Sequence, residues 1–319
     1  MASAKKAELP QGFLDGPAPN LIKHVVDFKK EGIPVYEGRW AVILDGVLSE
    51  EECDWLTKAA EATTAGEWER AMVNVGNGQQ RLYEDTRKCG RIIWDDREVV
   101  AKIWARIQDS VPDIHRLQDW ADVTGLGPAK RKETWKVTRL NERMRFLKYV
   151  GGEYFKAHND GCYETPDGTE RSYFTLHLYL NDAADQLKGG ATTFYDYRMD
   201  KKIDVDPKSG RILIFQHRNL LHSGDDVKSG IKYTMRTDIM YTKEYAAYCT
   251  TVSRRSAHNL RTDSHRDTKT LRQAQRLGPE LSDAECRRES RQALTGSRAS
   301  TREQGAGRRS EDYSEFLIC

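Results

Sequence analysis

The sequence lacks the features that mark secreted, membrane-spanning or disulfide-stapled proteins. No apolar run is long enough to span a membrane, and the N-terminus MASAKKAELPQGF has no apolar signal core. The six cysteines are scattered without a CxxC pair, at Cys53, Cys89, Cys162, Cys249, Cys286 and Cys319. We therefore expect free thiols in a reducing compartment, which favours a cytoplasmic protein, with the nucleus as the alternative.

A strong excess of charge of one sign is also missing. The chain carries 51 basic and 49 acidic residues, for a net charge of +2. This balance gives no basic surface of the kind that binds nucleic acid, so nucleic acid is an unlikely partner and a nucleic-acid demethylase is disfavoured. With 38% hydrophobic and 31% charged residues, the composition indicates a globular domain joined to a polar extension.

The composition changes twice along the chain. Residues 1–35 mix Pro, Gly and Lys, and are expected to form a loose N-terminal lead-in. Residues 36–250 carry the periodic apolar patterns of a folded domain. Residues 251–319 are rich in Arg, Ser, Thr and Glu, and predict a largely disordered polar tail, with a short helix at 271–277 or 282–293.

Two helices are expected before the strands begin. Ser49 and Glu52 have the spacing of a capping box ahead of an apolar helical face. Asp95 or Asp96 can cap a second helix, whose apolar face recurs through Ile107 at helical spacing. Period-two runs then predict strands at 40–44, 143–150, 173–180, 191–195, 211–215 and 232–241. The pattern predicts a mainly β fold with flanking helices: a jelly roll with an N-terminal helical buttress.

The strand at 173–180 has two distinct faces. Phe174, Leu176, Leu178 and Leu180 share the apolar face, and Tyr173, Thr175, His177 and Tyr179 share the other. His177, on the same side as Tyr179, is expected to line the pocket.

The triplet His158-Asn-Asp160 is the most informative pattern in the chain. On a strand, residues two apart point the same way, so the imidazole and the carboxylate can bind one metal ion. A third ligand from a neighbouring strand would complete a 2-His-1-carboxylate triad, which suits non-haem Fe(II). The candidates are His177, His217 and His222.

The surroundings of His222 favour it as the third ligand. Lys232 follows ten residues later on a predicted strand, where its ammonium could bind the distal carboxylate of a dicarboxylate that chelates the metal. Arg236 lies on the same strand face and is the alternative anchor, because a guanidinium binds carboxylates in a bidentate manner. Alternatively, Arg236 could pair with Asp238 or hold Asp160 in place.

These motifs resemble the catalytic domain of the prolyl 4-hydroxylase alpha subunit and its superfamily of iron(II)/2-oxoglutarate oxygenases. The resemblance runs from about residue 40 to residue 241. It rests on the segments Tyr149…Asp160, Leu178-Tyr-Leu-Asn181, Gly189-Gly-Ala-Thr-Thr-Phe194, Gly210…Phe215 and His222-Ser-Gly…Gly230-Ile-Lys232.

The resemblance implies a double-stranded β-helix with Fe(II), 2-oxoglutarate as co-substrate and ascorbate as reductant. It carries His158, Asp160 and His222 over as metal ligands and catalytic residues. It carries Lys232 over as the anchor of the 2-oxoglutarate C5 carboxylate. Tyr179 resembles a tyrosine that supports this carboxylate, and Tyr149 is a second candidate for the co-substrate pocket.

The implied activity is that of a 2-oxoglutarate-dependent dioxygenase. It would use O2 and 2-oxoglutarate to hydroxylate a C–H bond of a protein side chain or a small molecule, with succinate and CO2 as co-products. Because residues 162–172, after the metal motif, form a polar segment and no peptide-binding domain precedes the motif, collagen-type hydroxylation is disfavoured. The competing hypothesis is a catalytically silent jelly roll that binds a structural metal.

Overall fold

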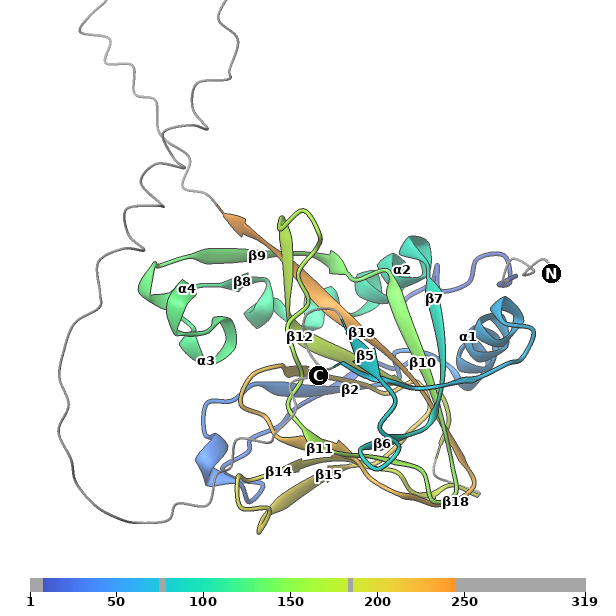
Figure 1. Ribbon diagram of the computed structural model, residues 1–319. Coiled ribbons are helices and arrows are strands. Elements are labelled where there is room, and N and C mark those ends of the chain that lie inside the picture. The colour runs from blue at the N-terminus through green and yellow to red at the C-terminus, as the bar shows by residue number, and fades with distance from the viewer. Residues whose placement is uncertain (1–7, 75–78, 183–185, 245–319) are drawn as a thin grey trace, which may run out of the picture. The chain divides into compact units, whose positions relative to one another are not determined.

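Two facing β-sheets form the described part of the protein, which is a computed structural model covering residues 8–74, 79–182 and 186–244 (Figure 1). The path of the major sheet runs, in spatial order, through β1 (Ile22–Val25), β2 (Ala41–Asp45), β16 (Ile212–Gln216), β12 (Glu170–Tyr179), β19 (Ile231–Glu244), β10 (Arg143–Val150), β7 (Gly90–Asp95) and β3 (Glu69–Arg70). Strand β9 (Thr134–Leu140) also pairs with β19, and β8 (Arg116–Leu117) pairs with β9.

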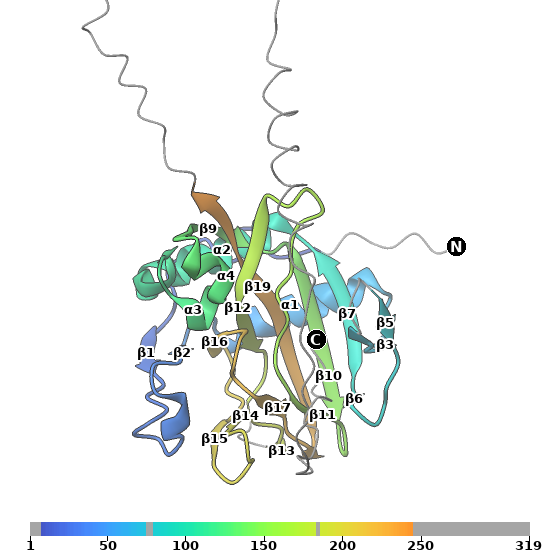
Figure 2. The same cartoon turned by 60° about the vertical axis from the view of Figure 1, so that its left-hand side comes forward.

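The minor sheet carries the HxD motif. Its order is β15 (Lys202–Val205), β14 (Thr192–Tyr195), β17 (His222–Gly224), β11 (Tyr154–His158) and β6 (Arg87–Lys88). Two small antiparallel pairs complete the described strands: β13 (Lys188–Gly189) with β18 (Val227–Ser229), and β4 (Val73–Asn74) with β5 (Gln80–Arg81). Figure 1 and Figure 2 together show that β11 and β14 of the minor sheet lie opposite the strands of the major sheet.

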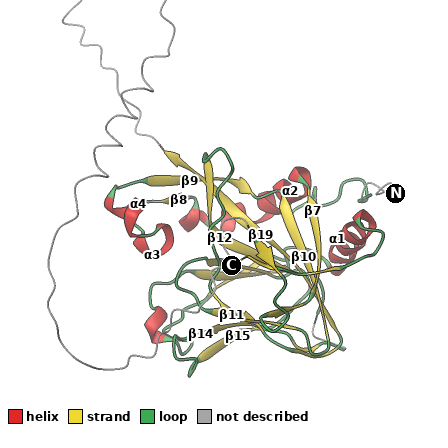
Figure 3. Cartoon of the chain, in the orientation of Figure 1, coloured by secondary structure: helices red, strands yellow, loops and turns green. Residues whose placement is uncertain are grey.

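The helices all precede the central strands in the sequence. They are α1 (Glu50–Thr63), α2 (Arg97–Ile107), α3 (Ala121–Thr124) and α4 (Leu126–Lys130), drawn red in Figure 3, with short 3-10 turns at Pro34–Tyr36, Gln108–Ser110 and Pro112–Ile114. Ser49 caps α1 through a reciprocal capping box with Glu52. Asp96 caps α2 by accepting from two backbone N–H groups. Both expected helices are confirmed, and none of the described helices is long and apolar enough to cross a membrane.

Successive side chains of the major-sheet strands point to opposite faces of the sheet, and each face packs against a separate hydrophobic core. On one face, Phe146, Leu176 and Ile214 pack in a cluster with the buried sides of α1 and α2. On the other face, Leu147 and Leu213 pack toward the minor sheet, in two smaller clusters. This is the expected jelly roll with a helical buttress, and it leaves room for a pocket between the sheets.

The N-terminal segment differs from the loose lead-in that its composition predicts. Phe13 and Leu14 are buried in the helix-side cluster, and β1 pairs with β2. Phe28 and Tyr36 are buried against Phe194 of β14. Spaced apolar residues in a polar segment can anchor a chain that has no regular periodicity, and composition does not reveal such anchors.

The strand boundaries agree with the expectation to within a few residues. Strand β10 matches residues 143–150, and β19 extends the expected 232–241 at both ends. Tyr173 is a departure, because it packs against Tyr241 in the helix-side cluster. The pairing of β12 with β19 shifts register between Ser172 and Phe174, which interrupts the alternation of faces. The expected tail at 251–319 lies outside the described residues.

Candidate metal centre and co-substrate pocket

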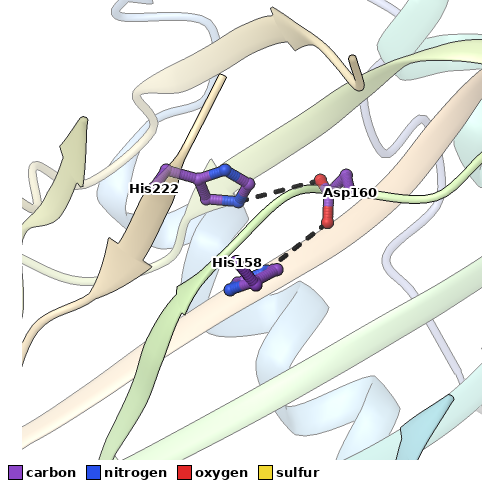
Figure 4. A group of neighbouring side chains, drawn as sticks. All are labelled: His158, Asp160 and His222. Carbon is purple, nitrogen blue, oxygen red and sulfur yellow. Dashed lines mark ion pairs between the residues drawn. The ribbon is translucent and has the colours of Figure 1, made fainter. Parts of the chain in front are cut away.

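His158, Asp160 and His222 converge at the edge between the two sheets. His158 ends β11 and His222 begins β17, and these residues are direct partners in the antiparallel register. The His158 Nε2 lies 3.5 Å from Asp160 Oδ1, and the His222 Nε2 lies 3.9 Å from Asp160 Oδ2 (Figure 4). Their ligand atoms all lie within 4.8 Å of one another, close enough to share one ion.

Backbone carbonyls orient both imidazoles. His158 Nδ1 lies 2.8 Å from Lys156 O, and His222 Nδ1 lies 3.0 Å from Leu220 O. Because a carbonyl oxygen only accepts, each Nδ1 carries the hydrogen and each Nε2 keeps its lone pair for a metal. Burial, followed by the nearby His158, lowers the pKa of His222 to about 4, so its imidazole is neutral near pH 7.

Asp160 is held in its ionised form. Burial alone would raise its pKa, but the Arg236 guanidinium, the largest opposing cause, helps to hold the pKa well below its usual range. Its Oδ2 accepts from Thr175 Oγ1 at 2.5 Å and lies 3.1 Å from Arg236 Nη2. Two imidazoles whose Nδ1 atoms bond to backbone carbonyls, and one carboxylate held by Thr175 and Arg236, fit a divalent first-row ion such as Fe(II).

A pocket between the sheets adjoins this triad. His158, Asp160 and His222 line one part of it, and Lys232 and Tyr149 line another. Its walls therefore combine ligand atoms from the minor sheet with a cation from β19 of the major sheet.

Lys232 is a buried cation in this pocket. Its side chain is 2% exposed, and its ammonium makes no ion pair or hydrogen bond with any described residue. The Nζ lies 5.2 Å from the ring centroid of Tyr149 and 5.7 Å from that of Tyr179. Burial lowers its pKa to about 8, although Asp225 and Cys89 act in the opposite direction. A buried ammonium of this kind is complementary to an anionic ligand.

Tyr149 and Tyr179, the two tyrosines expected in the co-substrate pocket, differ in their position relative to it. Tyr149 lines the pocket beneath the Lys232 ammonium. Tyr179 does not line it, and its hydroxyl donates to Thr192 Oγ1 at 2.7 Å. Thr192 does line the pocket, so the Tyr179 hydroxyl is connected to the pocket wall through Thr192.

Arg236 is occupied by carboxylates of the protein. Its Nη2 lies 3.1 Å from Asp160 Oδ2 and 3.3 Å from Asp238 Oδ1. It also donates to Thr175 Oγ1 at 3.2 Å. Arg236 therefore contacts both carboxylates named in the alternative interpretation of this residue, Asp160 and Asp238.

The two rejected histidine candidates lie outside the ligand group. His217 is fully buried, with Nε2 3.6 Å from Asp238 Oδ1, and His177 lines the pocket wall. Neither joins His158, Asp160 and His222 in the convergent set found among the described residues.

Three polar side chains near the site were not assigned a role from the sequence. Thr175 donates to Asp160, and Thr192 links the pocket to Tyr179. Thr234 is fully buried, on the same strand face as Lys232, and its Oγ1 has no described hydrogen-bond partner. Period-two spacing from Lys232 and from His177 could have drawn attention to Thr234 and Thr175.

One family model matches the part of the chain that contains the site. The model of the 2OG-Fe(II) oxygenase superfamily matches residues 144–237, a range that begins in β10 and ends in β19. It includes His158, Asp160, His222, Lys232 and Arg236. No curated protein sequence matches the chain significantly.

Several solved structures are similar over much of their length. A viral collagen prolyl hydroxylase from Paramecium bursaria Chlorella virus-1, in complex with 2OG, is 21% identical; the match covers 64% of this chain and 97% of the viral one, with a TM-score of 0.39. A Pseudomonas putida prolyl-4-hydroxylase is 15% identical, with 60% and 87% coverage and a TM-score of 0.38. A Trichoplax adhaerens prolyl hydroxylase, bound to a hypoxia inducible factor peptide fragment, is 17% identical, with 53% and 70% coverage and a TM-score of 0.34.

Proposed function

Because residues 144–237 belong to the 2OG-Fe(II) oxygenase superfamily, we propose that this 2-oxoglutarate-dependent oxygenase hydroxylates a C–H bond of a protein side chain or a small molecule. Succinate and CO2 are the co-products. The observation that carries the proposal is the buried Lys232 ammonium in the same pocket as a convergent His158–Asp160–His222 set.

The triad would hold iron through His158 Nε2, His222 Nε2 and a carboxylate oxygen of Asp160. Bound Fe(II) supplies the oxidising chemistry that couples decarboxylation of 2-oxoglutarate to hydroxylation. The protein contributes orientation: the two backbone carbonyls fix the imidazole rings, and Thr175 and Arg236 fix the carboxylate.

Lys232 would bind the C5 carboxylate of 2-oxoglutarate. Its ammonium is desolvated by burial, so a carboxylate that enters the pocket gains a charge-assisted hydrogen bond in a site of low dielectric. Tyr149 forms the apolar wall beside this ammonium. Leu147, Phe155 and Phe215, which also line the pocket, exclude water from the methylene groups of the co-substrate.

We also propose ascorbate as the reductant that keeps the iron in its ferrous state.

Cys53, Cys89 and Cys162 are free thiols in the described residues. They support a site of action in the cytosol or nucleus, where thiols stay reduced.

The test is formation of succinate by the purified chain with Fe(II), ascorbate and 2-oxoglutarate. We expect slow turnover that is uncoupled from any second substrate, and at least a 100-fold loss, as an order of magnitude, in His158→Ala and Asp160→Ala. His115→Ala is the matched control, because His115 bonds to Gln108 O and does not line the pocket.

The same assay distinguishes the proposed enzyme from the alternative hypothesis, a catalytically silent module that binds a structural metal. An iron-loaded chain that binds 2-oxoglutarate but forms no succinate, with or without peptide and metabolite extracts, would favour the module. Comparing metabolites and peptides treated with active enzyme or with His158→Ala would then identify the hydroxylated substrate.

A further inference from the structure

His177 is a pocket side chain to which the proposed function assigns no role. It lies on β12, where its Cα partners are Arg236 of β19 and Leu213 of β16. The residue lines the pocket that also contains Lys232 and Asp160. It is therefore placed to contact whatever molecule fills the space beside the anchor and the triad.

The Nε2 atom of His177 has unused hydrogen-bonding capacity. It is buried and has no hydrogen-bond partner among the residues that the structure describes. Buried polar atoms in native proteins are nearly always bonded, so an unpartnered one in a pocket wall points to a ligand that supplies the partner. The ring centroid lies 4.9 Å from that of Tyr179, and this contact fixes the ring without using a nitrogen.

The charges around His177 determine what kind of ligand group it can bind. Burial, and then the nearby Lys232, Arg236 and His222, lower its pKa well below the usual range, against the opposite effect of Asp160. The imidazole is thus neutral and keeps one N–H donor. A neutral donor beside several cations is complementary to an anionic oxygen and poorly suited to a cationic ligand.

A role as a metal ligand does not fit this position. His177 is absent from the convergent set of ligand atoms formed by His158, Asp160 and His222. Its neighbours on β12 have other tasks, since Thr175 holds Asp160 and Tyr179 bonds to Thr192.

We propose that His177 donates a hydrogen bond from Nε2 to an oxygen of bound 2-oxoglutarate, as a co-substrate-binding residue additional to Lys232. This inference rests on the proposed function, because it takes 2-oxoglutarate as the occupant of the pocket. It predicts that the chain binds its co-substrate through both a charge at Lys232 and a neutral donor on the neighbouring strand.

The experiment measures 2-oxoglutarate binding by calorimetry, without oxygen, to the full chain loaded with Fe(II). His177→Leu keeps the bulk of the side chain and removes the donor, and should weaken binding by about tenfold. His177→Gln places an N–H donor at a similar distance, and should remain within about threefold of the wild type. His115→Leu, the control outside the pocket, should leave binding unchanged.

The outcomes distinguish this inference from the proposed function. If the wild type binds no 2-oxoglutarate, the proposed function fails. If the wild type binds it and Lys232→Ala weakens binding, but His177→Leu binds as tightly as the wild type, only the role of His177 is overturned.

A second measurement does not depend on folding of the variants. In the wild-type chain loaded with Zn(II) and labelled with 15N in its histidines, the Nε2–H of His177 should become protected from exchange when 2-oxoglutarate is added. Binding of 2-oxoglutarate without any change in the His177 signal would contradict the proposal.

Discussion

At the scale of single residues, Lys232 and Arg236 lie on the same strand, β19, but have different surroundings. Lys232 is a buried ammonium with no ion pair to a described residue, whereas Arg236 contacts Asp160 and Asp238. The sequence placed both on one strand face but left the choice between them open. The position of Asp160, which comes from another part of the chain, distinguishes the surroundings of Arg236 from those of Lys232.

The first prediction compares Lys232→Ala with Arg236→Ala. Loss of the ammonium should raise the KM for 2-oxoglutarate by about 10- to 100-fold, because a hydrogen bond to a charged group is lost, with little change in iron affinity. Loss of the guanidinium should instead weaken iron binding, because Asp160 loses a support. Both variants should be assayed for succinate formation and iron content. The reverse pattern would make Arg236 the anchor.

The second prediction concerns pH. Burial lowers the pKa of Lys232 to about 8 in the free protein, so the ammonium is charged below this pH and neutral above it. A bound carboxylate requires the charge, so binding above pH 8 must take up a proton. The Kd for 2-oxoglutarate should rise by about tenfold per pH unit there.

Lys232→Arg is the control for the pH prediction, since a guanidinium stays charged throughout this range. Its Kd, measured by calorimetry from pH 7 to 9.5, should be nearly constant. An equally steep rise in this variant, or a flat profile in the wild type, would show that Lys232 does not titrate as stated.

At the scale of elements, local signals predicted some boundaries and missed others. Ser49 and Asp96 cap their helices as the spacing indicates, and β10 has the expected ends. Strands β11 and β17, which carry the two histidines proposed as metal ligands, have five and three residues. These strands form by pairing with each other and with β14 and β6. The periodicity of their own few residues therefore could not have predicted where they begin and end.

The third prediction concerns Asn181, which connects the end of β12 to the start of β19. Its Nδ2 donates to Ile231 O at 2.7 Å, and its Oδ1 accepts from Tyr233 N at 2.8 Å. These hydrogen bonds hold the backbone on both sides of Lys232. Asn181→Ala should therefore raise the KM for 2-oxoglutarate by roughly 3- to 10-fold, equivalent to one or two neutral hydrogen bonds.

Steady-state kinetics and iron content would be measured for Asn181→Ala together. Asn181→Asp keeps the acceptor for Tyr233 N and should have a smaller effect. Loss of iron with an unchanged KM would refute the link between Asn181 and the anchor.

At the scale of the whole molecule, pairing between distant segments could not be predicted from the sequence alone. The motif His158-x-Asp160 and the candidate His222 were recognisable, but their adjacency depends on the β11–β17 pair. The N-terminal segment shows the same limit. Its apolar residues are few, and their burial against β14 becomes evident only once the sheets have formed.

The fourth prediction tests this role of the N-terminal segment. Phe28 is 2% exposed and makes edge contacts with Tyr36 and Phe194, whose strand pairs with the start of β17 at His222. Phe28→Ala should lower the free energy of unfolding by about 3–5 kcal/mol, as expected for a large buried aromatic. Denaturant titration would measure it.

Ile22→Ala is the matched control from the same segment, because Ile22 is 57% exposed. Its effect should stay within about 0.5 kcal/mol. Equal, small effects of both substitutions would mean that the segment is the loose lead-in that its composition suggests.

We propose that one pocket joins an iron-binding triad to a 2-oxoglutarate anchor. The most direct measurement is an anaerobic calorimetric titration of the full chain with 2-oxoglutarate, with and without Fe(II), in the wild type and in Asp160→Ala. We expect one 2-oxoglutarate per chain, with tight binding only when Fe(II) is present and loss of that iron-dependent gain in Asp160→Ala. Equal affinity with and without Fe(II), or iron-dependent binding that persists in Asp160→Ala, would show that the triad and the anchor do not share one co-substrate site.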